Sequence, residues 1–81
     1  RRSDYERTTL HRNGAIAGVA DLTIHWPGRG TYYAEMKDGK KGPSRSQVDF
    51  LNARIREGFP CGVHRSWASV EAALIKAGAP I

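Results

Sequence analysis

The chain has 81 residues, of which 40% are hydrophobic and 26% are charged, and it contains one cysteine. This length limits it to a single small domain over residues 1–81, and the composition excludes a disordered or collagen-like protein. Thirteen Lys and Arg residues outnumber eight Asp and Glu residues, and the resulting net charge of +5 favours an anionic partner such as nucleic acid. Since no apolar run approaches the roughly 20 residues of a membrane span and one cysteine forms no internal disulfide, we expect an intracellular protein without a membrane partner.

Residues 1–12 are mostly polar and charged, and three interpretations are open for them. They form a frayed arm, an edge strand, or the remnant of a helix that begins earlier in the protein. The chain does not begin with methionine, so we expect further residues before Arg1. Asn13 and Gly14 then predict a turn, and the small residues at 14–20 predict a loop whose glycines allow another group to approach the backbone closely.

Two strands are predicted next. Residues 22–26 alternate in polarity and are rich in β-formers, and residues 31–37 show a second run of the same kind. The composition of residues 27–30 predicts a turn between them, so the two strands should pair as an antiparallel hairpin. Residues 38–43 follow as a flexible basic loop.

A helix is predicted to begin after Ser44. Gln47 stands three residues later, which is the spacing of a capping box, and Gly58 is placed to end the helix. One face of this helix carries apolar residues at helical spacing, namely Val48, Leu51 and Ile55.

The rest of the chain predicts a short strand at 59–64 and a final helix. Ser66 or Ser69 caps this helix, which runs to about Ala77 and ends at Gly78. The predicted order is therefore β-β-α-β-α. A helix between the hairpin and the third strand gives an α/β sandwich in which the third strand returns beside the hairpin.

Three charged residues of the hairpin are candidates for chemistry. Asp21 stands where the glycine-rich loop enters the first strand, and Glu35 and Lys37 share one face of the second strand because side chains repeat every two residues. If the hairpin pairs as predicted, Asp21 approaches Glu35. Two carboxylates suit Mg²⁺ or Mn²⁺, and a lysine beside them suits phosphodiester hydrolysis. A Glu-x-Lys pair is also common on an ordinary solvated strand face.

The surrounding sequence resembles a known family. The residues that carry the resemblance are GVADL at 18–22, AEMK at 34–37, GPSRSQ at 42–47 and the helix that runs on to Gly58. Together they resemble a VRR-NUC domain, the virus-type replication-repair nuclease branch of the PD-(D/E)xK superfamily. The resemblance extends from about residue 13 to residue 78. It implies a small restriction-endonuclease-like α/β/α core.

The resemblance also implies roles for individual residues. Asp21, Glu35 and the backbone carbonyl of Met36 would bind Mg²⁺ or Mn²⁺. Lys37 would position the nucleophilic water, and Gln47 would support the site. The capping box alone also explains Gln47.

The sequence departs from the family pattern at two places. Ala20 stands where a proline usually precedes the aspartate. Such domains also begin with a helix that carries a further acidic ligand, whereas only Asp4 and Glu6 precede Asp21 here. Glu6 is the better candidate for this ligand, and whether the site holds one metal or two depends on it.

Several basic side chains near these motifs are candidates for binding DNA phosphates. The three histidines of the chain lack the spacing of a zinc site, although His11 lies next to the 13–14 turn. The candidates for phosphate contact are Lys40, Lys41, Arg45, Arg12 and His11. The aromatic residues either stack on bases or pack in a core or dimer contact; these are Trp26, Tyr32, Tyr33 and Trp67.

The function that we expect is metal-dependent DNA endonuclease activity, selective for branched or junction DNA. The alternatives are a non-catalytic nucleic-acid-binding module with the same fold and a basic structural protein. We also expect a homodimer, because so short a chain builds a thin core and because one site cuts one strand.

Overall fold

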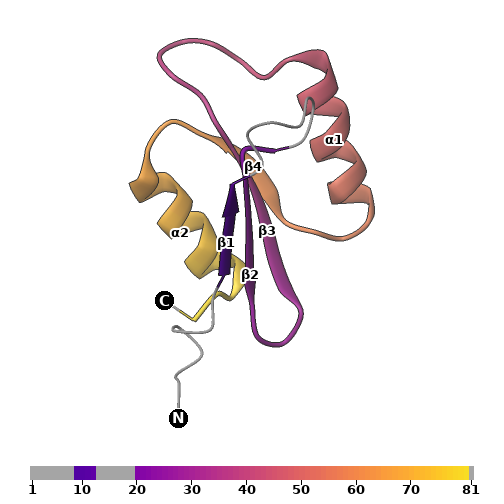
Figure 1. Ribbon diagram of the computed structural model, residues 1–81, viewed down its shortest axis with the longest axis vertical. Helices are drawn as coiled ribbons and strands as arrows, with labels where there is room; N and C mark the ends of the chain where they lie inside the picture. Colours follow the sequence, from indigo (N-terminus) through magenta and orange to yellow (C-terminus); the bar gives the residue numbers. More distant parts are fainter. Residues whose placement is uncertain (1–8, 13–19, 81) are drawn as a thin grey trace.

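A four-stranded sheet lies at the centre of the chain, with one helix against each of its faces (Figure 1). The computed structural model describes residues 20–80 and, for the backbone alone, residues 9–12. The elements in chain order are β1 (Thr9–Arg12), β2 (Leu22–Trp26), β3 (Gly30–Met36), α1 (Arg45–Arg56), β4 (Cys61–His64) and α2 (Trp67–Ala77). The expected α/β sandwich is confirmed.

The predicted hairpin is formed by β2 and β3, which pair antiparallel with Leu22 opposite Ala34 and Trp26 opposite Gly30. Its turn contains Gly28 and Arg29, both at positive φ. On its other edge β2 pairs antiparallel with β1. Among the three interpretations of the N-terminal segment, the edge strand is therefore confirmed for residues 9–12. The described sheet has one strand more than the predicted order.

The third predicted strand is β4, which pairs with β3 in parallel, as expected for a strand that follows a crossover helix. The last pair in this ladder joins Met36 to His64, and the Lys37 N–H then donates to the His64 carbonyl at 2.9 Å. Since β3 and β4 end together, the loops that follow them leave from the same edge of the sheet.

The helix ends follow the predicted caps. The Ser44 side chain accepts from the Gln47 N–H, and the Gln47 side chain accepts from the Ser44 N–H, which completes the capping box of α1. Ser66, not Ser69, is the N-cap of α2, and Gly78 ends that helix in the left-handed conformation with φ +98°.

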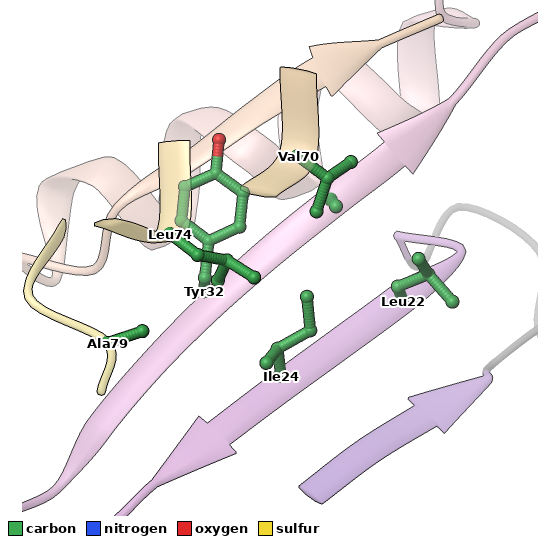
Figure 2. Packing of buried hydrophobic residues seen from close by; sticks show 7 residues of the cluster. Leu22, Ile24, Tyr32, Val70, Leu74 and Ala79 are labelled. Carbon is green, nitrogen blue, oxygen red and sulfur yellow. The ribbon is translucent and has the colours of Figure 1, made fainter. Parts of the chain in front are cut away.

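The hydrophobic core lies between α2 and the sheet. Figure 2 shows side chains of β2 and β3 packed towards α2, and the buried cluster comprises Leu22, Ile24, Tyr32, Ala34, Val70, Leu74 and Ala79. The opposite face is covered by α1. There the Tyr33 ring makes edge-to-face contacts with Phe50 and Phe59.

One predicted core position of α1 is wrong. Ile55 is 57% exposed, whereas Leu51 is buried and Phe50 contacts the sheet. The buried face of α1 centres on positions 47, 50, 51 and 54, and Ile55 lies on its flank. Within residues 9–12 and 20–80, no helix has the length and apolar character to cross a bilayer.

Candidate functional site

The candidate site lies where β2 begins and β3 ends. The antiparallel register places Leu22 opposite Ala34, so one step further Asp21 stands opposite Glu35. The Asp21 Oδ2 accepts a hydrogen bond from the Met36 N–H at 3.0 Å. This bond continues the ladder through a side chain and holds the Asp21 carboxylate against the end of β3.

Glu35 is the most unusual residue of the described chain, because it is 1% exposed and yet carries a carboxyl group. Its Oε2 accepts from Gln47 Nε2 at 2.8 Å and lies 3.4 Å from Lys37 Nζ. Its Oε1 is buried and has no hydrogen-bond partner. A buried acceptor without a partner costs about 1–3 kcal/mol, so Glu35 weakens the fold where it stands.

The electrostatics agree with this geometry. Burial, and after it the neighbouring Asp21 carboxylate, raises the pKa of Glu35 above its ordinary value of 4.5. The Lys37 ammonium acts in the opposite sense and offsets part of this rise. A second positive charge at Oε1 would remove both the repulsion between the carboxylates and the missing contact.

Gln47 connects the first turn of α1 to this carboxylate. Its Oε1 accepts from the Ser44 N–H at 2.8 Å, and its Nε2 donates to Glu35 Oε2. One orientation of the amide satisfies both contacts. The capping interpretation and the site interpretation of Gln47 therefore describe the same side chain.

The donor set fits a hard divalent cation. Two carboxylates at one sheet edge, with an unpartnered oxygen on Glu35, provide the oxygen ligands that Mg²⁺ and Mn²⁺ prefer. Residues 20–80 contain no cluster of three or more His, Cys, Asp or Glu side chains suited to a metal ion. Within these residues a third protein ligand would be a backbone oxygen, such as the Met36 carbonyl, or an uncharged side-chain oxygen. Glu6 lies outside the described residues.

The predicted phosphate-binding residues fall in different places. Lys40 and Lys41 are exposed in the loop between β3 and α1, which leaves the sheet next to the site. Arg45, in the first turn of α1, forms an ion pair with Asp49 at 3.2 Å. The backbone of Arg12 pairs with Leu22 beside Asp21, and that of His11 with Thr23, but their side chains lie outside the described part of the chain.

The aromatic residues and the single cysteine have mostly structural environments. Tyr32 is buried, Tyr33 packs under α1, and Trp67 is 49% exposed at the start of α2. Cys61 is a half-buried free thiol whose Sγ lies 3.6 Å from the Leu51 carbonyl. Burial raises the pKa of the Cys61 thiol, which makes it a poor nucleophile.

The structure adds two features that the sequence did not single out. First, a polar chain joins Tyr32, His64 and Ser69. The Ser69 hydroxyl donates to the Ser66 carbonyl, so it accepts from His64 Nδ1 at 2.9 Å, and His64 Nε2 accepts from the Tyr32 hydroxyl at 2.8 Å. Burial lowers the pKa of His64, which agrees with this neutral tautomer.

The second feature is Arg65. Its guanidinium donates to the carbonyls of Gly39 and Lys41 in the loop before α1. The sequence could have indicated this contact only through the topology. Because β3 and β4 are parallel and end at the same edge of the sheet, the residue after β4 lies next to the loop after β3.

A solved structure titled "VRR_NUC domain" superposes with a TM-score of 0.67, and the match covers 89% of this chain and 82% of that one at 21% identity. This chain has the VRR-NUC fold. The restriction-endonuclease-like fold that the resemblance implied is thus confirmed. No family model and no curated protein matches the sequence.

Proposed function

We propose that this chain, which has the VRR-NUC fold, is a Mg²⁺- or Mn²⁺-dependent DNA endonuclease that hydrolyses phosphodiester bonds. The observation that carries the proposal is the Glu35 carboxyl, which is buried with one oxygen held by Gln47 and the other without a partner, opposite Asp21. A module that only binds phosphate gains nothing from two carboxylates at its binding edge. A hydrolase needs them, because they hold the cation that the reaction requires.

The residues of the site then have separate tasks. Asp21, Glu35 and the Met36 carbonyl would hold the cation, which when bound supplies Lewis-acid stabilisation of the phosphate and an acidified water. The Met36 N–H orients the Asp21 carboxylate, and Gln47 Nε2 holds Oε2 of Glu35 so that Oε1 stays available. Each contact fixes an oxygen ligand in advance, which reduces the reorganisation needed at the site.

Lys37 would act on the attacking water and on the phosphate rather than on the metal. Its side chain is 21% exposed and its Nζ lies 3.4 Å from Glu35 Oε2, so the side chain is partly open to solvent beside the two carboxylates. From there it orients the attacking water and stabilises the negative charge that develops on the phosphate. Because it is a cation, it does not compete for the metal.

The partner that we propose is duplex or branched DNA, which the net charge of +5 and the exposed Lys40 and Lys41 favour. We also propose that the working unit is a homodimer, because one Asp21–Glu35–Lys37 set cuts one strand and two related sets address both. Sedimentation at micromolar protein tests this part. A single 8.9 kDa species with and without DNA would contradict it.

The test of the activity is cleavage of labelled linear, flapped and branched DNAs in Mg²⁺, Mn²⁺ or EDTA. We expect metal-dependent nicking that is lost in Asp21→Asn and retained in Asp38→Asn, which removes an exposed carboxylate of the adjacent loop. Retained cleavage in Asp21→Asn would contradict the assignment of the site. Binding of these DNAs without cleavage in either metal would support the non-catalytic module instead.

A further inference from the structure

The loop between β3 and α1 carries the two lysines proposed to contact DNA, and it has little structure of its own. Residues 37–44 form neither helix nor strand. A turn closes within the loop, where the Lys41 N–H donates to the Asp38 carbonyl at 3.2 Å and Gly39 has φ +56°. Such a turn does not determine where the loop lies relative to the site.

Arg65 makes the contacts that hold the loop in place relative to the sheet. It is the first residue after β4, and its Nε donates to the Gly39 carbonyl at 2.7 Å. A terminal nitrogen of the same guanidinium donates to the Lys41 carbonyl. The two carbonyls flank Lys40, so one side chain holds the lysine-bearing part of the loop from both sides.

The arrangement also concentrates positive charge. Arg65 donates to neutral carbonyls, and within residues 20–80 no carboxylate lies within ion-pair distance of it. Its charge therefore adds to those of Lys40 and Lys41. Like charges held together repel one another in the free protein, and an anion that bridges them relieves this repulsion.

We propose that Arg65 is a positioning residue that presents Lys40 and Lys41 to the DNA backbone beside the cleavage site. This inference rests on the proposed function for its ligand, but the contact itself does not. The role requires the planar fork of an arginine, because two separated nitrogens reach two carbonyls at once, whereas lysine offers a single point charge.

The test compares Arg65→Lys and Arg65→Ala with the wild type in two measurements. Amide hydrogen exchange of residues 38–42, followed by NMR without DNA, reports the order of the loop. Fluorescence anisotropy with a short duplex in EDTA, over a series of salt concentrations, reports DNA affinity without cleavage. Arg56→Lys and Arg56→Ala are the matched controls, since Arg56 is an exposed arginine in the last turn of α1.

We expect both Arg65 variants to exchange faster in the loop and to bind DNA roughly tenfold more weakly, because the loop must then be ordered on binding. Arg65→Lys should resemble Arg65→Ala although it keeps the charge, and the Arg56 variants should keep wild-type loop exchange. Wild-type behaviour of Arg65→Lys in either measurement would overturn the proposal. If the wild-type protein binds no DNA, the proposed function fails, and faster exchange then leaves Arg65 a purely structural role.

Discussion

Replacing Glu35 with glutamine should stabilise the metal-free protein while it removes metal binding. The substitution keeps the size of the side chain and the acceptor for Gln47 Nε2, but it removes a buried charge. Glu35 is 1% exposed, and its Oε1 has no hydrogen-bond partner. The uncharged amide also removes the repulsion between Glu35 and the neighbouring Asp21 carboxylate.

The direction follows from the raised pKa of Glu35. A carboxyl group that holds its proton more tightly in the folded state contributes stability in full below its unfolded pKa of about 4.5, and this contribution is lost as the pH rises through the folded value. At pH 7 the ionised group therefore weakens the fold. The advantage of Glu35→Gln over the wild type should be near zero at pH 4 and should grow as the pH rises.

The size of this stability difference follows from the hydrogen bond that Glu35 Oε1 lacks. A buried acceptor without a partner costs about 1–3 kcal/mol, and the lost attraction to Lys37 offsets part of the gain, so we expect about 1–2 kcal/mol at pH 7. In a domain of this length that corresponds to a rise in Tm of about 4–16 °C. Thermal unfolding in EDTA, followed by circular dichroism, measures it.

Added metal should reverse the order of stability, so that the wild type becomes more stable than Glu35→Gln. Mn²⁺ at about 100 times its Kd stabilises a folded site by about 2.7 kcal/mol, and this gain is expected for the wild type and not for Glu35→Gln. Asp49→Asn is the control, since it neutralises an exposed carboxylate of α1, and it should change stability by less than about 0.5 kcal/mol in either condition. A Glu35→Gln protein that is less stable than the wild type in EDTA at pH 7 would refute the reasoning.

Three further predictions concern the site, the loop and the buried histidine. Lys37→Ala should lower the cleavage rate by about 10²–10³ while Mn²⁺ binding by calorimetry is retained, and undiminished turnover would remove Lys37 from the chemistry. Replacing Lys40 and Lys41 together with alanine should flatten the salt dependence of DNA binding by roughly two units for any duplex, and a loss for only some sequences would mean that these residues contact bases. Burial lowers the pKa of His64 below 6.5, so its contribution to stability is complete above that pH and is lost as the pH falls. In urea unfolding, the stability gap between the wild type and His64→Gln should therefore narrow from pH 7 to pH 5, and a constant gap would contradict the neutral tautomer.

Much of this fold could be predicted because its signals are local. Ser44 and Gln47 are three residues apart and complete the capping box that their spacing predicts. Gly78 ends α2 in a conformation that residues with a Cβ rarely adopt. The alternation in residues 22–26 and 31–37 predicted the hairpin, and its register follows from the turn between the strands. That register alone brings Asp21 opposite Glu35.

The features that escaped prediction depend on contacts between distant residues. Residues 9–12 have weak strand character, and β1 forms because β2 offers it an open edge. The contacts of Arg65 with Gly39 and Lys41 join residues 26 and 24 positions apart, respectively, and they need β3 and β4 to be parallel. The exposure of Ile55 reflects how α1 rotates when Phe50 packs on Tyr33, which helical spacing does not determine.

The most direct test of the central claim is the position of a bound Mn²⁺ ion, measured by anomalous diffraction from crystals of this protein soaked in manganese chloride. We expect one dominant anomalous peak in contact with the Asp21 carboxylate, Glu35 Oε1 and the Met36 carbonyl oxygen. No peak there at millimolar Mn²⁺, or peaks confined to other parts of the surface, would contradict the claim that these residues form the metal site of a nuclease.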